Sequence, residues 1–328
     1  MEAGQMQRKT IAVCIISYNQ RDYLIEAIES VLAQTRMPDQ IIVIDDVSPD
    51  DSVEVLRQYD RDHPGLFTIV VNEINQGNGT NRHLGVLQSN CDLITYLDGD
   101  DLYYPEKLKL EEQCLIDNPE AGFVYSDLKL IDSDGNTIRP WTTIKQDIPA
   151  GDVFESVIGF EFPGGVQCRF PLTNTESLIE ATKHAQGFSL YEDLVIMMHL
   201  SRFMKSAFVD SVNVGYRLHD AGVHRTHHEG HSNVLDKIYL QNKHLFESLS
   251  PEPRKRIEKK FRRILCLYAW RGVRDHARRP SKLSKGRAKV LAKRAMRHDP
   301  LALRPKHVMR VLSTQLKSPK FPPAKISN

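Results

Sequence analysis

Three carboxylates stand together in the segment Tyr96–Leu102, whose sequence is YLDGDDL, directly after an apolar run. Like charges crowded at the end of a strand are unfavourable unless a cation or hydrogen-bond donors compensate them. The oxygens of Asp98, Asp100 and Asp101 would suit a hard divalent ion such as Mg²⁺ or Mn²⁺, which could bridge the diphosphate of a nucleotide. The alternative is an ordinary solvated turn, because Asp-Gly pairs are common in turns.

A second acidic pair, Asp45-Asp46, follows the apolar run Ile41–Ile44 in the same arrangement. A parallel sheet would bring both acidic groups to one edge, where an Asp can accept a hydrogen bond from a base N–H or a ribose hydroxyl. The simpler alternative is that Asp46 or Ser48 caps the helix that follows.

Between the two acidic groups lies the loop 75–85, with sequence NQGNGTNRHLG. Its glycines permit close backbone approach, and Arg82 could pair with a phosphate. The loop lacks the spacing of a P-loop, so ATP chemistry of the kinase type is not indicated. An ordinary connection from strand to helix is the alternative.

Short apolar runs alternate with helical patterns through the first hundred residues, which is typical of strands buried on both faces and joined by helices. The runs are Ile11–Ile16, Ile41–Ile44, Thr68–Val71 and Leu93–Leu97. The alternation predicts an α/β fold with right-handed crossovers and a mainly parallel sheet that has helices on both faces. Ligands of such sheets bind beyond the carboxyl ends of the strands.

After Asp101 the pattern is less regular. It predicts a hairpin turn at 132–136, a Gly-rich loop at 159–165, a helix at 194–204 and basic helices beyond His231, with the end of the chain frayed. We therefore expect a catalytic domain over residues 1–230 and a basic helical extension over residues 231–328, of which the last ten or so are flexible.

Charge is divided unequally along the chain. Of its 44 Lys and Arg and 42 Asp and Glu, 24 basic and four acidic residues lie from Pro251 to Asn328. Basic residues there alternate with apolar ones at helical spacing, which is typical of helices that lie on an anionic membrane surface. Solvated helices packed on the catalytic domain are the alternative. No module typical of nucleic-acid binding is recognisable, so we expect no nucleic-acid partner.

The five cysteines are scattered and form no C-x-x-C pair, which favours a reducing compartment and argues against a zinc site. The segment Met1–Thr10 has no apolar core of a secretory signal, and no stretch approaches the roughly 18 apolar residues of a membrane span. We expect a cytoplasmic protein, peripheral on the inner face of the cell membrane.

Four segments together resemble glycosyltransferase family 2, the inverting enzymes with the GT-A fold, in the type that builds bacterial surface polysaccharides. In chain order they are ISYNQRDYLIEAIESVLAQT, IIVIDDVSPDDS, NQGNGTNRHLG and ITYLDGDDLYYPEKL. The resemblance covers about Ile11–His219 and is strongest up to Tyr125. It departs from the family where Val47 and Pro49 replace the usual Gly and Thr, and where His83 replaces Asn, which leaves the base preference open.

The resemblance implies a role for each matching position. A nucleotide-sugar donor would be bound by Ser17, Tyr18, Asn19, Asp45, Asp46, Arg82, Asp98 and Arg217, with Asp46 on the base. Asp98 and Asp100 would form the DxD element that holds Mn²⁺ or Mg²⁺, with Asp100 the more direct ligand. Arg217 and His219, in the segment YRLH, could reach the diphosphate or the metal, but His224, His227 and His228 nearby weaken the signal for His219.

The family places its catalytic base in an acidic pair before a helix, and Glu192-Asp193 fits that description. Asp193 would take the proton of the acceptor hydroxyl as that oxygen attacks the anomeric carbon. The alternative is that both carboxylates only favour the positive N-terminus of the helix. Segment 168–187 departs from the family pattern, so acceptor contacts cannot be transferred to it.

The sequence thus predicts an inverting glycosyltransferase that moves a sugar from a nucleoside diphosphate donor to a glycan or lipid-linked acceptor. The expected donor is a UDP-sugar. The rival hypothesis is a catalytically silent nucleotide-sugar-binding or scaffold protein of a polysaccharide assembly.

Overall fold

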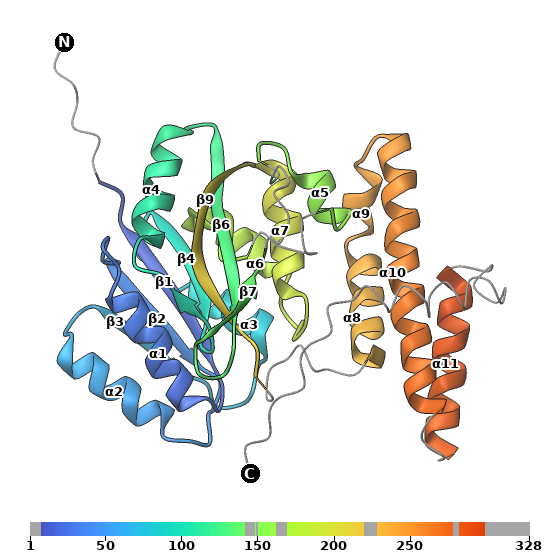
Figure 1. Cartoon of the computed structure of the whole chain (residues 1–328), viewed down its shortest axis with the longest axis horizontal. Coiled ribbons are helices and arrows are strands. Elements are labelled where there is room, and N and C mark those ends of the chain that lie inside the picture. The colour runs from blue at the N-terminus through green and yellow to red at the C-terminus, as the bar shows by residue number, and fades with distance from the viewer. Residues whose placement is uncertain are drawn as a thin grey trace. The chain divides into compact units, whose positions relative to one another are not determined.

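The computed structural model describes residues 8–141, 148, 150–161, 169–219, 228–277 and 282–298. The chain divides into two compact units. The first contains Met1–Arg225 and His244–Leu249, and the second contains Thr226–Lys243 and Ser250–Asn328. Figure 1 shows the elements of both units.

The first unit is built on a nine-stranded sheet with the order β3-β2-β1-β4-β8-β6-β9-β5, in which β7 pairs with β6. The strands are β1 (Ile11–Ser17), β2 (Gln40–Asp45), β3 (Phe67–Val71), β4 (Leu93–Asp98), β5 (Leu102–Tyr103), β6 (Ala121–Ile131), β7 (Thr137–Pro140), β8 (Leu172–Asn174) and β9 (Lys205–Arg217). Its helices are α1 (Arg21–Leu32), α2 (Ser52–Asp62), α3 (Asn78–Val86), α4 (Lys107–Asp117), α5 (Phe154–Ile158), α6 (Thr175–Lys183) and α7 (Glu192–Phe203), and α9 (Lys243–Glu247) falls mostly within it.

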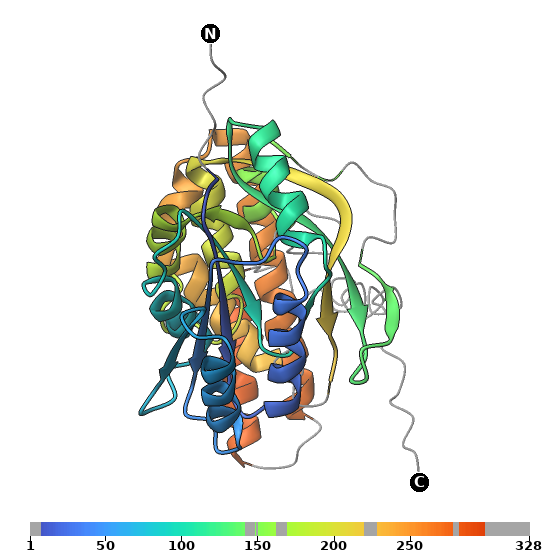
Figure 2. The ribbon, with the colours of Figure 1, turned by 90° about the vertical axis from the view of Figure 1, so that its left-hand side faces the viewer.

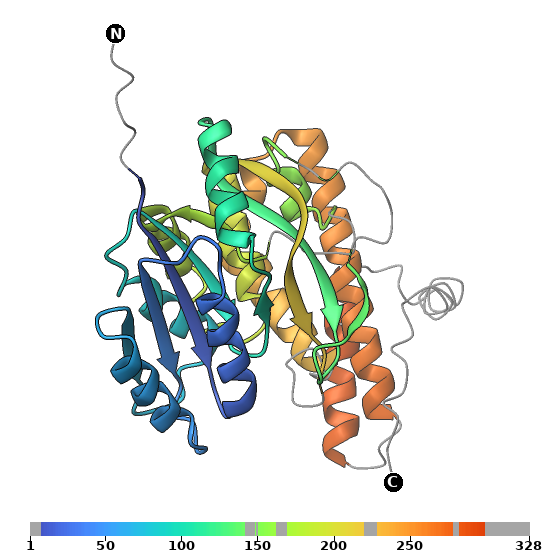
Figure 3. The same cartoon turned by 60° about the vertical axis from the view of Figure 1, so that its left-hand side comes forward.

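The four predicted parallel strands form the first half of the sheet. β1 pairs with β2 and β4, and β2 pairs with β3, all in parallel. Every residue of β1 and β2 is buried, which explains their continuous apolar sequences. The helices cover both faces, as predicted: α1 packs with α2, while α3 packs with α6 and α7. Figures 2 and 3 show α1 and α4 in front of the sheet.

The chain direction across the sheet reverses between β1 and β4. From β1 the chain moves outward to β2 and β3, then returns through α3 to β4 on the other side of β1. This is a topological switch point, where open α/β sheets leave a crevice at the carboxyl ends of the strands. The acidic turn that follows β4 lies at this point.

The second half of the sheet is mixed. β6 and β9 are parallel to each other, whereas β8, β5 and β7 run antiparallel to their neighbours. The predicted turn at 132–136 joins β6 to β7, and its Asp132 accepts hydrogen bonds from the backbone of Asp134 and Asn136. The predicted Gly-rich loop at 159–165 extends beyond the described residues.

One predicted loop is largely helical. Segment 75–85, expected to be a loop, is helical from Asn78, where α3 begins, and Leu87 just after the helix is half exposed. The buried face of α3 is polar and small instead, with Arg82 and Gly85 among its buried residues. A helix that buries an arginine does not show the apolar periodicity on which the prediction relied.

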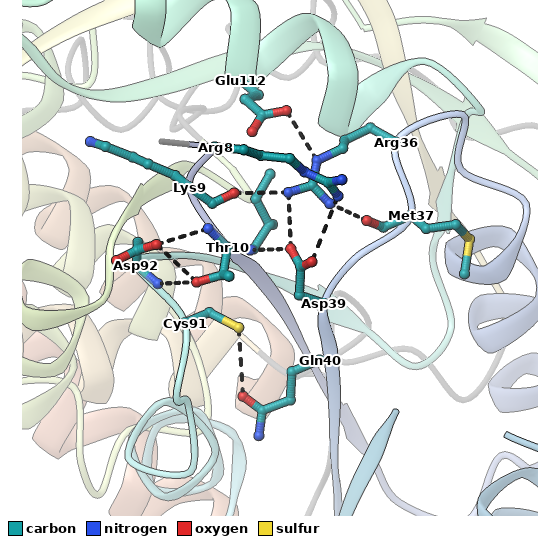
Figure 4. Close-up of polar contacts among 11 residues, drawn as sticks. Arg8, Lys9, Thr10, Arg36, Met37, Asp39, Gln40, Cys91, Asp92 and Glu112 are labelled. Carbon is teal, nitrogen blue, oxygen red and sulfur yellow. Dashed lines mark hydrogen bonds and ion pairs between the residues drawn. The ribbon is translucent and has the colours of Figure 1, made fainter. Parts of the chain in front are cut away.

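At the opposite end of β1, Arg36 connects the start of the sheet to its flanking helix (Figure 4). Its guanidinium donates to the Lys9 carbonyl at 2.9 Å, to Asp39 Oδ2 at 2.9 Å and to Glu112 Oε2 on α4 at 3.1 Å. Asp39 Oδ2 also accepts from the Ile11 N–H at 2.8 Å. One buried arginine therefore fixes the start of β1, the connection into β2 and α4.

The second unit is helical, with α8 (His228–Gln241), α10 (Pro251–Ala277) and α11 (Lys282–His298). α10 packs against α8 and α11, and the apolar side chains Ile257, Phe261 and Leu265 of α10 are buried. Among the helices described, none combines the length and the apolar character that a bilayer span requires.

Candidate active site

The polar residues that end β1, β2 and β4 are brought side by side by the strand register. Ser17 pairs with Asp45, and Ile16 pairs with Asp98. The turn after β4 approaches β1 so closely that a Cβ on Gly99 would stand 2.9 Å from the Ile16 carbonyl oxygen and 3.1 Å from Ser17 Cβ. Only glycine fits there without displacing β1.

The acidic turn gathers three carboxylates around one small volume. Asp98, Asp100 and Asp101 each offer one oxygen, and these three oxygens lie within 4.8 Å of one another. Asp101 is buried; its Oδ1 accepts from the Arg217 N–H at 2.8 Å, whereas its buried Oδ2 has no hydrogen-bond partner among the residues that the structure describes. The turn is therefore not the ordinary solvated bend that the sequence left open.

Burial and the crowding of the three carboxylates raise the pKa of two of them. Burial raises the pKa of Asp98 against the opposing effect of Arg82, and the neighbouring Asp100 raises it further. Burial, together with Asp100 and Asp98, holds the pKa of Asp101 well above its ordinary value. A divalent cation would relieve this repulsion and would supply a partner for the buried Asp101 oxygen. The residues present therefore fit an oxygen-bound Mg²⁺ or Mn²⁺.

Arg82 lies within the cluster as a buried tether. Its Nη2 donates to Asp98 Oδ1 at 2.6 Å and to Glu192 Oε1 at 3.2 Å, and its guanidinium stacks 4.2 Å from the centroid of the Tyr96 ring. Its Nε and Nη1 are buried, and no hydrogen-bond partner for them lies in the described part of the chain. The loop arginine thus joins the acidic turn to the acidic pair of α7, a connection between segments 110 residues apart that the sequence did not indicate.

The acidic pair begins α7, immediately after Tyr191, whose φ of +58° lies in the left-handed region. Glu192 and Asp193 are both buried, and burial raises the pKa of Glu192 against the opposing effect of Arg82. Asp193 Oδ1 accepts from the Leu194 N–H at 2.8 Å, so its interaction with the start of the helix, the alternative role, is present as well.

Arg169 is a site residue that the sequence did not identify. Its Nη2 lies 3.1 Å from Asp193 Oδ2, and its guanidinium stacks 4.5 Å from the centroid of the Tyr216 ring. Arg169 falls in segment 168–187, which departs from the family pattern, so the resemblance implies no role for it. Its only signal in the sequence is a cationic side chain in an otherwise uncharged stretch, because its partners come from distant elements.

Arg217 and His219 lie beside the same turn. Arg217 Nε donates to the Asp100 carbonyl at 2.8 Å, and its Nη2 pairs with Glu26 Oε2 on α1 at 2.5 Å. His219 Nε2 lies 2.9 Å from Asp100 Oδ2, and its ring lies 4.9 Å from that of Tyr23. Both predicted residues are thus beside Asp100. His224 and His227 lie outside the described residues, as does the side chain of His228.

The Asp46 carboxylate is hydrogen-bonded to the loop that follows β3. Its carboxylate accepts from the N–H groups of Gln76 at 2.7 Å and Gly77 at 2.9 Å, and from Asn72 Nδ2 at 2.8 Å. Neither Asp46 nor Ser48 caps α2, whose first turn is instead bound by Asp50 through Ser52. Asp45 is fully buried; its Oδ1 accepts from the Ser48 N–H, and within the described ranges its Oδ2 has no hydrogen-bond partner.

The residues at the end of β1 differ from one another in exposure. Ser17 is buried, with its hydroxyl unpartnered, whereas Tyr18 is 49% exposed. Asn19, with a left-handed φ of +52°, donates its N–H to Ser48 Oγ at 2.9 Å and so joins this end to that of β2.

Comparison with known proteins agrees with this geometry. Residues 12–162 match the model of glycosyl transferase family 2. This segment is a glycosyltransferase family 2 domain. An uncharacterized glycosyltransferase of Nostoc sp. is 33% identical to the chain over 133 residues, which are 40% of this chain and 41% of that protein. The putative teichuronic acid biosynthesis glycosyltransferase TuaG of Bacillus subtilis is 24% identical over 148 residues, 45% of this chain and 58% of the relative. The chain thus spans about half the length of these relatives or less.

Solved structures extend the similarity beyond the matched family 2 domain. TarS 1-349 of S. aureus, in complex with UDP-GlcNAc, superposes with a TM-score of 0.64 at 16% identity over 88% of this chain and 81% of that one. The mannosyltransferase PcManGT of Pyrobaculum calidifontis, in complex with GDP-Man and Mn²⁺, gives 0.53 at 15% identity over 94% and 85%. The fold is GT-A, as the sequence predicted.

Proposed function

We propose that this protein is an inverting glycosyltransferase that transfers a sugar from a UDP-linked donor to a glycan or lipid-linked acceptor of the cell envelope. The observation that carries the proposal is the convergence of the acidic turn, Arg82 and the pair Glu192-Asp193 at the switch point of a GT-A sheet. The UDP-GlcNAc in the TarS complex favours UDP, and the name of TuaG favours a cell-envelope polysaccharide.

The donor would bind across the ends of β1 and β2. Ser17, Tyr18 and Asn19 would line the nucleoside pocket, in which Tyr18 is the exposed aromatic side chain. Asp45 has a carboxylate oxygen without a partner, whereas Asp46 would have to release the loop at Gln76 and Gly77 before it could accept from the base. We therefore propose that Asp46 shapes the pocket through this loop as much as through contact with the base.

Asp98 and Asp100 would hold the divalent ion with help from the buried Asp101, while His219 holds Asp100 in place. When bound, Mn²⁺ or Mg²⁺ would stabilise the negative charge that develops on the departing nucleoside diphosphate. Arg217, fixed by Glu26 and by the Asp100 carbonyl, adds a positive charge on the same side of the turn.

Asp193 would act as the general base. It takes the proton of the acceptor hydroxyl while that oxygen bonds to the anomeric carbon and the bond to the diphosphate breaks, which inverts the configuration of that carbon. Arg169 near Asp193 and Arg82 beside Glu192 balance the charge of the two buried carboxylates. Glu192 supports the base through Arg82 and does not itself take the proton.

The test is a panel of UDP- and GDP-sugars offered to the purified protein with Mn²⁺ and with a chelator. We expect metal-dependent donor turnover, with an inverted anomeric configuration in the product by NMR. Asp193→Asn should lower transfer by about 10²–10⁴-fold while UDP binding is retained. Glu180→Gln, which changes an exposed carboxylate on α6, is the matched control and should leave turnover unchanged.

Two results would count against the proposal. Wild-type turnover in Asp193→Asn would remove the assignment of the base. Nucleotide binding without turnover of any donor would instead favour the silent scaffold protein.

We propose that residues 1–230 form the catalytic domain, that residues 231–328 form a basic extension, and that the protein acts at the inner face of the cell membrane. The excess of basic residues from Pro251 onward supports this placement.

A further inference from the structure

A fully buried ion pair lies on α4, outside the proposed donor site. Lys107 and Glu111, one turn apart on α4, are both 0% exposed, and Lys107 Nζ lies 2.5 Å from Glu111 Oε2. Ser126 Oγ donates to the other Glu111 oxygen at 2.7 Å. Burial lowers the pKa of Lys107 and raises that of Glu111, against the attraction between them. Because a buried ion pair is often no more stabilising than apolar residues of the same volume, stability alone does not explain it.

The ammonium group of Lys107 has a second partner, the backbone carbonyl of Phe170. Lys107 Nζ donates to this oxygen at 3.1 Å, and Thr95 Oγ1 donates to it at 3.1 Å as well. Phe170 has a φ of +54°, a conformation that is strained for an aromatic residue and that persists only where the surroundings impose it. The two donors from α4 and β4 are that constraint.

The conformation of Phe170 sets the course of the residue before it. Phe170 is bonded directly to Arg169, so anchoring the Phe170 carbonyl in its left-handed conformation limits where the planar peptide bond between the two residues, and with it the Arg169 Cα, can lie. That side chain lies 3.1 Å from Asp193 Oδ2. A second residue with a left-handed backbone, Tyr191, stands two positions before Asp193. Strained backbone thus flanks both partners of the contact.

We propose that Lys107, held by Glu111, is a positioning residue for the transfer step: it fixes Phe170 so that Arg169 orients Asp193. This inference rests on the proposed function, since it gives Lys107 a role only if Asp193 is the base. Lys107 is fully buried, so its effect should appear in kcat and not in nucleotide binding.

The experiment compares four variants in the full chain. Lys107→Met leaves Glu111 buried without its partner and should lower the Tm. The pair variant Lys107→Met with Glu111→Met replaces the whole ion pair by apolar side chains and should keep the wild-type Tm or exceed it. Thr95→Val removes the second donor to the Phe170 carbonyl, together with the hydrogen bond of 3.0 Å between Thr95 Oγ1 and the Tyr103 hydroxyl. Lys109→Met, on the exposed side of the same helix, is the matched control.

We expect the pair variant to bind UDP with a Kd within about twofold of wild type while its kcat falls by about 10–100-fold, because small misplacements of catalytic groups are costly. Thr95→Val should lower kcat in the same direction, and Lys109→Met should change neither quantity. A pair variant with wild-type Tm and wild-type kcat would overturn the proposal, as would unchanged kcat in a folded Thr95→Val. Absence of turnover in the wild type would instead refute the proposed function, so the two failures are distinguishable.

Discussion

The backbone at Val47 has a φ of +61°, in the left-handed region where a β-branched side chain clashes with its own chain. Val47 stands where glycine is usual in the family, and the conformation shows why glycine is usual there. Hydrogen bonds on both sides hold the strained residue: the Asp45 carboxylate accepts from the Ser48 N–H, and Ser48 Oγ accepts from Asn19. Its side chain is 39% exposed, so packing offsets little of the strain.

Val47→Gly should therefore stabilise the protein. Relief of the left-handed strain contributes about 1–2 kcal/mol, from which the extra backbone entropy of glycine in the unfolded chain subtracts about 0.5–1 kcal/mol. Denaturant unfolding should show a higher midpoint with an unchanged slope. Val47→Ala, which keeps a Cβ at the same φ, should gain much less. Equal gains from glycine and alanine would show that side-chain contacts, and not the backbone, cause the strain.

At the residue scale, the sequence predicts the side chains that end strands and misses those whose role depends on distant partners. Asp45, Asp98 and Asp100 follow apolar runs, and parallel strands bring such positions to one edge whatever the rest of the fold does. Arg169 acquires its place only through Asp193 and Tyr216. No local pattern marks an arginine whose neighbours are 24 and 47 residues away.

At the scale of the elements, the Arg36 network connects the start of β1 with α4. Arg36→Met should destabilise the protein by about 2–3 kcal/mol, because it removes charge-assisted hydrogen bonds from two carboxylates, that of Glu112, whose side chain is 17% exposed, and that of Asp39, whose side chain is 33% exposed. Unfolding in urea at neutral pH measures the loss. Arg8→Met, which removes an exposed arginine 3.6 Å from the same Asp39, is the control and should cost less than about 1 kcal/mol.

The same network predicts how the effect depends on pH. Burial would raise the pKa of Asp39, but the Ile11 N–H and Arg36 outweigh it, so the pKa is lowered. A lowered folded pKa stabilises the protein above the unfolded value of about 3.9, and this stabilisation is lost as the pH falls through the folded pKa. The difference between wild type and Arg36→Met should thus shrink below about pH 4. A constant difference down to acid unfolding would mean that Asp39 contributes nothing to it.

The elements themselves differ in how well the sequence predicts them. The strands β1, β2 and β4 can be predicted from their apolar runs, because both faces of these runs lie in the core. Strand β8, three residues long, and the two-residue β5 carry no such pattern. Their pairing depends on tertiary contacts that short segments do not encode.

At the scale of the whole molecule, the charge of the chain is divided between its two parts. The basic residues from Pro251 onward exceed the acidic ones by 20, while the remainder carries 20 basic and 38 acidic residues. The sequence predicts that the basic amphipathic helices lie on an anionic membrane surface, and in the structure the apolar side chains Ile257, Phe261 and Leu265 of α10 are buried. Exposed on α10 are basic side chains, among them Lys255, Lys259 and Arg263 at spacings of four. This side chain distribution favours electrostatic attraction to an anionic bilayer without deep insertion.

We therefore expect the protein to sediment with vesicles that contain anionic lipid, to leave neutral vesicles unbound, and to be released as salt rises from about 0.1 M to about 0.5 M, where screening shortens the reach of the charges. Replacing Lys255, Lys259 and Arg263 by Glu should weaken vesicle binding by about 100-fold or more, since each basic residue near the surface contributes about 1 kcal/mol. UDP binding measured in parallel should be unchanged, because these residues lie in the second unit and the proposed nucleotide pocket lies in the first. Binding that survives high salt would instead require apolar insertion, which the buried face of α10 could provide only by leaving α8 and α11.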